Sequence, residues 1–306
     1  RNTPTVSIII TTYMRDLNIM SLSIESVLKQ TYTDFELIIV DDSPEDYVNR
    51  MSVCEYCKEL IRSDDRITYI QHLRNLGACA ARNTGLTFSK GEYVCFLDDD
   101  DRYTTDHVSS LLAVFYSHPD IALAYSNVEI RNTVKPKLKK TFFDSSVQYR
   151  GFVLKKILEN NFIGPTSAVM IRAEVLKNVG GFDIRMPAFQ DWELWIRICR
   201  LYKIEFTNSV LLKYYIYPGE RITNNTSKRL RALTVLNSLN KDDIQNDVDI
   251  YVARKYYEMR LNAINHDFNS TLRSYTAIIK KRPKAVLSNI LMAKSFARIF
   301  IKNLNA

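Results

Sequence analysis

The stretch from Gly91 to Asp101, GEYVCFLDDDD, joins a candidate buried strand to four consecutive carboxylates. Its strand portion, Glu92–Leu97, lacks the alternation of polar and apolar residues that marks a half-exposed strand. A continuous run of this kind is typical of a strand buried on both faces of a parallel sheet. The sequence therefore predicts an acidic loop at the carboxyl end of a central strand.

The four residues Asp98–Asp101 repel one another, so the cluster is costly unless a cation or basic side chains compensate it. No His or Cys pattern accompanies the aspartates, and a hard divalent ion with oxygen ligands is the natural partner. The alternative is an acidic loop that caps the following helix, with Asp101 at the N-cap. On that helix, His107 is expected to pack or to face solvent.

Three similar runs precede this strand and are separated by helical patterns. Val6–Thr11, Phe35–Val40 and Ile67–Gln71 are predicted strands, and Gly77 opens a helix that runs to about Ser89. Alternating strands and helices predict a parallel sheet covered on both faces, which places the chain in the α/β class.

Polar residues follow the first, second and fourth of these strands. Ligands of open α/β sheets bind at the carboxyl ends of the strands. Thr11–Tyr13, Asp41–Asp42 and the four aspartates are therefore expected to form one site. The glycine patterns of dinucleotide-binding and P-loop proteins are missing from the sequence, which disfavours hydride transfer and P-loop nucleotide hydrolysis.

The rest of the chain has a less regular rhythm. Residues 120–220 indicate mixed α/β structure, with a strand at Ala168–Arg172, a turn at Gly180–Asp183 and a helix at Asp191–Tyr202. Beyond Thr223 the pattern is almost wholly helical. We therefore expect a domain boundary near residue 226.

The net charge of +8 is unevenly distributed along the 306 residues. Eight Lys or Arg residues and no acidic residue lie between Thr271 and Ala306. Lys294, Arg298 and Lys302 recur at every fourth position and share one helix face. Residues 285–304 therefore predict a basic amphipathic helix, which either lies on an anionic membrane surface or packs on the body with its cations in solvent.

Other features bear on the compartment. The sequence has no apolar run long enough to span a membrane and no visible signal peptide, and the missing initiator Met suggests a processed chain. The five cysteines include the pair Cys54 and Cys57, but no second pair completes a zinc site. We expect free thiols in a reducing cytosol.

Four stretches, taken in order, resemble the family-2 glycosyltransferases: Val6–Tyr13, Phe35–Ser43, Ala81–Asn83, and Gly91–Leu97 leading into the aspartates. The resemblance covers roughly residues 4–225. It implies a GT-A fold, with a mostly parallel central sheet flanked by helices and a helical C-terminal extension. The glycosyltransferase domain would occupy 1–226, with the nucleotide-sugar-binding half in 1–103 and the acceptor and catalytic-base half in 104–226; the extension would occupy 227–306.

The resemblance also implies roles for single residues in the donor half. Thr11, Tyr13 and Asp42 would meet the nucleoside, and the Asp42 carboxylate would accept a hydrogen bond from a base N–H. Arg82 and Asn83 would brace this region, with Arg82 counted among the nucleotide-binding residues.

The aspartates would provide the D-x-D element of the family as Asp98-x-Asp100. Asp100 is our first candidate for direct contact with Mn²⁺ or Mg²⁺, with Asp98 as its companion, and Asp98 and Asp99 would also lie near the nucleotide. Many relatives carry a His near the Tyr217 position, so its absence removes a third metal ligand. Arg221 would reach the diphosphate, because a guanidinium pairs bidentately with phosphate oxygens; a plain surface charge is the alternative.

A second group of residues, QDWELW at Gln190–Trp195, is expected to supply the catalytic base. Its apolar members recur at helical spacing, and Asp191 stands at the start of the helix, where the dipole favours its anionic form. The alternative is an ordinary N-cap. The resemblance favours Asp191 as general base; Gln190 replaces the Glu usual in the family, and Glu193 is the weaker candidate.

Together with the resemblance, these residues imply a metal-dependent inverting transfer of sugar from a UDP-sugar to a hydroxyl of a glycan acceptor. The acceptor would be a bacterial surface glycan, lipid-linked in one version, and the enzyme would be cytoplasmic, with the tail peripheral on the inner membrane face. A nucleotidyltransferase needs similar carboxylates and is the rival enzyme. A nucleic-acid-binding protein is suggested by the sequence pI near 9.1, but an acidic loop at the sheet end argues against nucleic acid as a partner.

Overall fold

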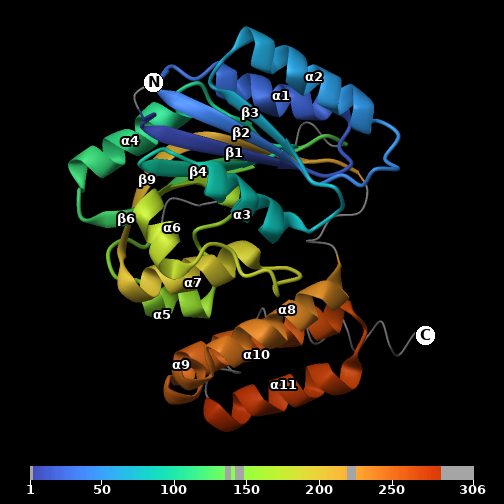
Figure 1. Ribbon diagram of the computed structural model, residues 1–306. Helices are drawn as coiled ribbons and strands as arrows, with labels where there is room; N and C mark the ends of the chain where they lie inside the picture. Colours follow the sequence, from blue (N-terminus) through green and yellow to red (C-terminus); the bar gives the residue numbers. More distant parts are fainter. Residues whose placement is uncertain (1–2, 135–138, 142–147, 219–224, 284–306) are drawn as a thin grey trace. The chain divides into compact units, whose positions relative to one another are not determined.

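The computed structural model describes residues 3–134, 139–141, 148–218 and 225–283. The predictions for Arg221 and for the helix at 285–304 lie outside the described residues. The chain divides into two compact units (Figure 1). The first comprises Arg1–Leu154, Phe162–Ile184 and Gln190–Pro218, and the second comprises Lys155–Asn161, Arg185–Phe189 and Gly219–Ala306.

The first half of the first unit is a parallel sheet with crossover helices. Its strands are β1 (Val6–Thr12), β2 (Phe35–Asp41), β3 (Ile67–Gln71) and β4 (Tyr93–Asp98), and its helices are α1 (Leu17–Leu28), α2 (Arg50–Ser63) and α3 (Ala78–Phe88). The four strands pair in the order β3-β2-β1-β4, and all three pairings are parallel. The predicted strands agree with these bounds to within one residue at either end.

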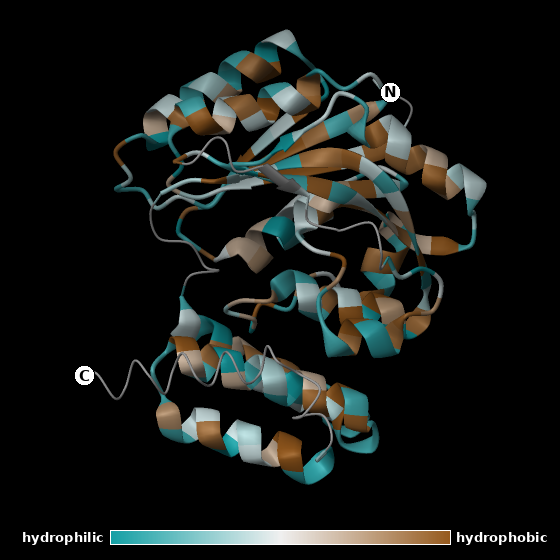
Figure 2. Cartoon of the chain, turned by 180° about the vertical axis from the view of Figure 1, so that it is seen from behind, coloured by the Kyte–Doolittle hydropathy of each residue, from teal (hydrophilic) through white to brown (hydrophobic). Residues whose placement is uncertain are grey.

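Alternate residues of each central strand point to opposite faces of this sheet, and both faces are covered. Ile8 and Ile10 of β1 belong to a core shared with Met20 of α1 and its neighbours on α2. Ile9 points the other way, toward α3, where a Cβ added at Gly85 would lie 2.4 Å from its Cγ2 atom. Figure 1 shows α1 and α2 on one side of the strands and α3 on the other, and brown apolar residues run along the strands in Figure 2. Burial on both faces explains why the strands have no polar alternation.

The second half of the unit extends the sheet with strands of mixed direction. It adds β5 (Arg102–Tyr103), β6 (Ile121–Asn132), β7 (Lys139–Thr141), β8 (Val169–Arg172) and β9 (Lys203–Ile216), with α4 (His107–Ser117), α6 (Ala173–Val179) and α7 (Gln190–Leu201). The full order is β3-β2-β1-β4-β8-β6-β9-β5, and β7 pairs with β6. β8 runs antiparallel to β4 and β6, whereas β6 and β9 are parallel. The predicted α/β class is confirmed, and parallel pairing is concentrated in its first half.

The described part of the second unit is helical. It contains most of α5 (Leu154–Glu159), together with α8 (Thr226–Leu239), α9 (Lys241–Asn246), α10 (Val248–Ile264) and α11 (Phe268–Lys281). Met259 of α10 and Ile278 of α11 form the centre of a small core. Lys155 makes ion pairs of 2.8 Å with both Asp247 and Asp249. Across the described ranges, every helix falls short of the length and apolar character that a bilayer-crossing segment needs.

Candidate functional site

The first unit has a topological switch point between β1 and β4. From β1 the chain builds β2 and β3 on one side and β4 on the other. In α/β sheets, ligands bind at the carboxyl ends of the strands at such a point. Thr11 is the register partner of Asp98 across these strands. The Thr12 hydroxyl donates to Asp99 Oδ2 at 2.7 Å, and the Asp42 N–H donates to the Thr12 carbonyl at 2.9 Å. The three loops predicted to converge therefore do so.

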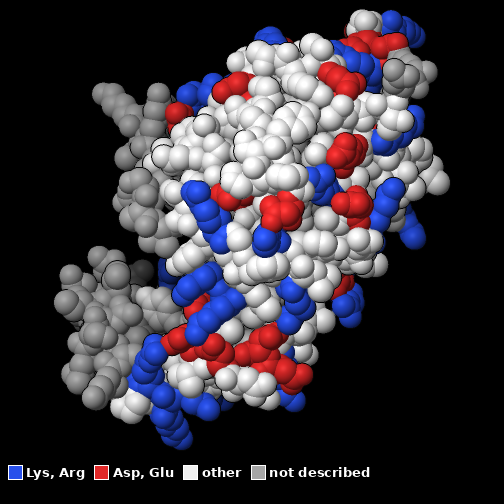
Figure 3. All heavy atoms as spheres, turned by 90° about the vertical axis from the view of Figure 1, so that its left-hand side faces the viewer, with Lys and Arg blue, Asp and Glu red and all other residues white. Residues whose placement is uncertain are grey.

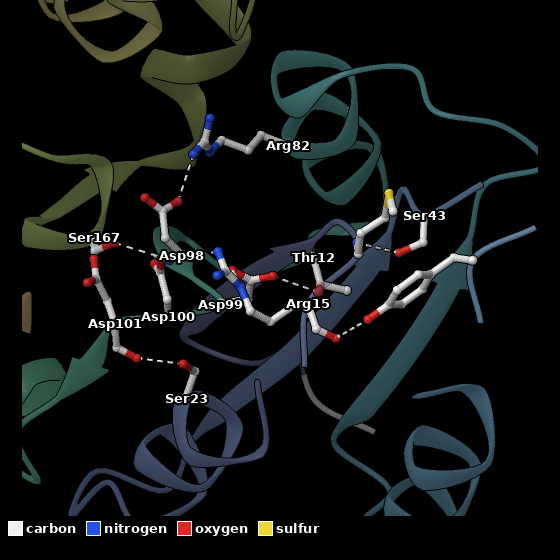
Figure 4. Close-up of polar contacts among 12 residues, drawn as sticks. Thr12, Arg15, Ser23, Ser43, Arg82, Asp98, Asp99, Asp100, Asp101 and Ser167 are labelled. Carbon is white, nitrogen blue, oxygen red and sulfur yellow. Dashed lines mark hydrogen bonds and ion pairs between the residues drawn. The ribbon is translucent and has the colours of Figure 1, made fainter. Parts of the chain in front are cut away.

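We call Asp98–Asp101 the aspartate loop, and its four carboxylates have different surroundings (Figure 4). Asp98 accepts from Arg82 Nη2 at 2.7 Å, and Asp100 accepts from Arg15 Nη2 at 3.0 Å. Their side chains are 32% and 17% exposed, against 7% for Asp99. The two residues of the predicted D-x-D element are thus more accessible than the aspartate between them.

Asp99 is buried within the loop and is held by two donors. The Thr12 hydroxyl and the Arg15 Nε–H contact its two oxygens at 2.7 and 2.8 Å. Burial raises the pKa of Asp99 to about 6, and the neighbouring Asp100 adds to the rise, whereas Arg15 and Thr12 oppose it. The contacts give Asp99 a structural role that fixes the loop against β1; its predicted contact with the nucleotide stays a prediction.

Asp101 is fully buried and does not cap the next helix. Its Oδ1 accepts from the Tyr215 N–H at 3.1 Å, and its carbonyl accepts from the Ser23 hydroxyl at 2.6 Å. Burial, together with Asp98 and Asp100, raises its pKa well above the ordinary range. The N-cap alternative is wrong, because α4 begins at His107 with Asp106 in the N-cap position.

Arg82 of α3 connects the aspartate loop to the start of α7. Its Nη2 contacts Asp98 at 2.7 Å, and its Nη1 donates to Gln190 Oε1 at 3.0 Å. Burial by itself lowers the pKa of Arg82, but Asp98 outweighs this effect and the pKa is raised, with a smaller contribution from Asp191. The guanidinium stays charged and joins the donor half to Gln190, the residue before the predicted catalytic base.

The neighbouring Asn83 fixes the turn that precedes α7. Its amide pairs with the backbone of Phe182 through two hydrogen bonds of 2.8 and 2.9 Å. The Phe182 ring lies under the Arg82 guanidinium, 5.4 Å from ring centroid to Cζ. Both glycines of the predicted turn have positive φ, +87° at Gly180 and +68° at Gly181, which explains the residue type at each. Asn83 thus braces the turn before α7, and the bracing of the nucleoside region expected of Arg82 and Asn83 stays a prediction.

Two acidic residues near the start of α7 have different environments. Asp191 is partly exposed, and its Oδ1 accepts from the Trp192 N–H at 2.8 Å. Glu193 is buried and receives two hydrogen bonds from Arg197, at 2.7 and 2.6 Å. The predicted apolar stripe is buried, as expected: Trp192, Trp195, Ile196 and Cys199. Of the two acids, Asp191 is the more exposed, and its role as the general base stays a prediction.

The Asp42 carboxylate is already well supplied with donors. His72 Nδ1 and the Leu76 N–H contact Oδ1, and the Gly77 N–H contacts Oδ2, all at 2.8 Å. These bonds anchor the loop between β3 and α3. The predicted hydrogen bond to a base N–H stays a prediction, and it would use the remaining capacity of Oδ2. Tyr13, predicted to meet the nucleoside, is 48% exposed beyond the end of β1.

The donor chemistry of Asp98 and Asp100 fits Mg²⁺ or Mn²⁺, which favour oxygen ligands and usually take one or two carboxylates. Among the described residues, no group of three or more His, Cys, Asp or Glu side chains could hold an ion by itself. A cation here would complete its shell with substrate phosphate oxygens and water, as Mg²⁺ commonly does. Each of the two carboxylates also has an arginine partner.

The sequence interpretation did not identify Arg15 or His72 as site components, and it noted Gln190 only as a replacement for the Glu usual in the family. Arg15 contacts two aspartates, His72 holds Asp42, and Gln190 accepts from Arg82. The signal for Arg15 was a basic residue shortly after the end of β1, in a chain whose central strand β4 runs into four aspartates. His72 carried the weaker signal of an imidazole directly after a strand end.

Comparison with known proteins identifies the family to which the chain belongs. The model of the family described as glycosyl transferase family 2 matches residues 7–180. The chain belongs to glycosyl transferase family 2. The glycosyltransferase is 30% identical over 221 residues to the uncharacterized glycosyltransferase MJ1057 of Methanocaldococcus jannaschii, covering 70% of this chain and 71% of that one. It is 30% identical over 227 residues to the Escherichia coli UDP-Glc:alpha-D-GlcNAc-diphosphoundecaprenol beta-1,3-glucosyltransferase WfgD, covering 74% and 82%.

A solved structure of the same fold is that of Staphylococcus aureus TarS 1–349 in complex with UDP-GlcNAc. It superposes with a TM-score of 0.68 at 16% sequence identity, covering 96% of this glycosyltransferase and 88% of TarS. The predicted GT-A fold is thereby confirmed. The face in Figure 3 carries both blue Lys and Arg side chains and red Asp and Glu side chains.

Proposed function

We propose that this family-2 glycosyltransferase moves a sugar from a UDP-sugar to a hydroxyl group of a glycan acceptor, with inversion at the anomeric carbon. In a single displacement, the acceptor oxygen attacks that carbon while its proton passes to the Asp191 carboxylate. The bond from the anomeric carbon to the diphosphate oxygen breaks, and UDP leaves with its electron pair. One base and one attack produce one inversion.

The observation that carries this proposal is the bridge made by Arg82. Its two amino groups contact Asp98 at the end of β4 and Gln190 at the start of α7, at 2.7 and 3.0 Å. Asp191 follows Gln190 directly, so the base candidate and the D-x-D carboxylates belong to one site of the first unit. Glu193 is engaged with Arg197, which supports Asp191 as the base.

The leaving diphosphate needs positive charge. Asp98 and Asp100 would hold a divalent cation, Mn²⁺ or Mg²⁺, that neutralises the charge developing on the diphosphate. Arg82 keeps the Asp98 carboxylate oriented, and the Asp99 contacts with Thr12 and Arg15 fix the backbone of the loop. The assignment of metal binding to Asp98 and Asp100 agrees with the greater exposure of these two side chains.

The relatives support a proposal for the acceptor and its location. WfgD and WfaP of Escherichia coli, the latter 29% identical over 237 residues, are both named as UDP-Glc:alpha-D-GlcNAc-diphosphoundecaprenol beta-1,3-glucosyltransferases. By analogy, the acceptor is a lipid-linked glycan, the process is the synthesis of a bacterial surface polysaccharide, and the site faces the cytoplasm. The basic segment 285–304 would dock on the membrane; its deletion should abolish binding to anionic liposomes, and unchanged binding would remove this role.

The decisive experiment screens UDP-, GDP- and dTDP-sugars for binding and for hydrolysis, with and without Mn²⁺. We expect metal-dependent release of UDP from one UDP-sugar. Release of pyrophosphate in the presence of a sugar 1-phosphate and a nucleoside triphosphate would instead identify a nucleotidyltransferase. If no donor binds with or without metal, the aspartate loop is structural and the proposal fails.

A further inference from the structure

Arg15 lies between β1 and α1, and its side chain contacts two carboxylates of the aspartate loop. Its Nε–H donates to Asp99 at 2.8 Å, and its Nη2 contacts Asp100 at 3.0 Å. Figure 4 shows the guanidinium between these two residues. A guanidinium is not deprotonated in proteins, so Arg15 is a permanent cation.

The backbone around Arg15 is fixed from both sides. The preceding Met14 has a φ of +47°, and its N–H donates to the Ser43 hydroxyl at 2.9 Å. The Arg15 carbonyl accepts from the Tyr47 hydroxyl at 2.9 Å, and Asp16 caps α1 through the Asn18 N–H. Residues on the loop after β2 therefore set where the Arg15 side chain begins. The side chain itself is 29% exposed and is long enough to change direction.

Arg15 and a divalent cation need the same carboxylate. Asp100 is the preferred metal ligand of the proposed function, and its Oδ2 accepts from Arg15 Nη2. A cation that approaches alone meets a site that already carries compensating charge, and it must displace a guanidinium without offering it a new partner. A diphosphate that arrives with the cation supplies that partner, because guanidinium and phosphate form strong charge-assisted pairs.

We propose that Arg15 is the counter-ion of the aspartate loop and that it leaves Asp100 for the donor diphosphate when nucleotide and divalent ion bind together. This inference rests on the proposed metal- and nucleotide-dependent function. Arg15 is then a positioning residue that suppresses binding of metal alone and favours binding of the metal–nucleotide complex. Its removal should shift these two affinities in opposite directions, which loss of a purely structural residue would not do.

The test measures Mn²⁺ binding by electron paramagnetic resonance of the free ion, with and without UDP. Relative to the unaltered chain, Arg15→Gln should bind Mn²⁺ about tenfold more tightly in the absence of UDP and about tenfold more weakly in its presence, as expected for loss of one close charge pair. Arg15→Lys keeps the charge without the two-pronged contact, so both constants should lie in between.

Arg66→Gln is the matched control. Arg66 pairs with Asp64 at 2.7 Å, and its side chain is 30% exposed, close to the 29% of Arg15, but it lies at the start of β3. Both Mn²⁺ constants should be unchanged in this variant. Thermal unfolding of each variant confirms that the proteins compared are folded.

The possible results distinguish a failure of the role inferred for Arg15 from a failure of the proposed function. The inference is overturned if Arg15→Gln weakens Mn²⁺ binding both without and with UDP. It is also overturned if neither Arg15→Gln nor Arg15→Lys changes Mn²⁺ binding. In either case Arg15 only supports the loop. In that case UDP binding by the unaltered chain still supports the proposed function. If the unaltered chain binds no UDP with Mn²⁺, the proposed function itself fails and the inference with it.

Discussion

Substitution of Gly181 by Ala tests whether the turn before α7 is built around Asn83. Gly181 has a φ of +68°, and a Cβ at this position would lie 2.7 Å from Asn83 Oδ1. The left-handed backbone costs a non-glycine residue roughly 1–2 kcal/mol. Displacing the Asn83 amide threatens its two hydrogen bonds to Phe182, and a buried group left unpaired costs about 1–3 kcal/mol more. We expect a total loss of roughly 2–5 kcal/mol in the free energy of unfolding.

The neighbouring Gly180 provides the control. Its φ is +87°, but a Cβ there meets no atom within 4 Å, so Gly180→Ala should cost only the backbone term of roughly 1–2 kcal/mol. Denaturant unfolding followed by tryptophan fluorescence suits the comparison, because the chain has two tryptophans and both lie on α7. Turnover should also fall more in Gly181→Ala than in Gly180→Ala, since Phe182 lies under Arg82.

The decisive quantity is the difference between the two variants. Equal losses of stability in Gly180→Ala and Gly181→Ala would mean that the Asn83 amide moves aside without cost. The turn would then owe its shape to the backbone conformation of the glycines, and the bracing role that we give to Asn83 would be wrong.

Three further predictions concern single side chains. His107 is fully buried, and burial lowers its pKa to about 4, below the ordinary 6.5; stability should therefore fall as the pH drops from about 6.5 to 4, by at most about 3 kcal/mol, and His107→Gln should lose this part of the pH dependence in urea unfolding curves. Asp191→Asn should reduce turnover by at least about 10²-fold while UDP-sugar binding by calorimetry is kept, whereas the matched change Glu193→Gln should keep turnover; near-native turnover in Asp191→Asn would exclude it as the base. Asp42→Asn replaces one acceptor oxygen by an amide donor that faces the Gly77 N–H. The free energy of unfolding should therefore fall by about 1–3 kcal/mol. An unchanged midpoint of denaturant unfolding would show that the loop does not depend on the carboxylate.

The first half of the fold was predictable because its strands are buried on both faces. Continuous apolar runs such as Val6–Thr11 leave little choice of secondary structure, and the turn residues after them fix where each strand ends. The second half was not predictable to the same degree. β6 and β9 are long strands with buried starts and partly exposed ends, so their apolar pattern is interrupted, and β5 has only two residues and depends on pairing with β9.

The candidate site shows the same division between local and tertiary information. The position of the aspartate loop follows from the strand before it, and the Thr12–Asp99 and Asp42–Thr12 hydrogen bonds show that the three loops converge as expected. The different environments of the four carboxylates depend on side chains that other elements of the fold contribute. Gln190 is an example, because it differs from the usual family residue, yet its amide oxygen still accepts the hydrogen bond from Arg82.

The sequence posed a choice between a cation and basic side chains as compensation for the four aspartates, and the structure gives a reason why one loop can use both. Each arginine of the site has a planar fork of donors and serves two acceptors: Arg15 contacts Asp99 and Asp100, and Arg82 contacts Asp98 and Gln190. Two cations therefore stabilise the loop as part of the folded protein, while burial favours the neutral form of Asp101. The partial exposure of Asp98 and Asp100 keeps these two carboxylates accessible to a ligand. Lysines could supply the same charge but not the same geometry, since an ammonium group lacks the fork that holds two acceptors in one plane. The residue type, and not only the charge, thus allows one acidic loop to be stable by itself while it keeps two carboxylates accessible for the metal–nucleotide complex of the proposed function.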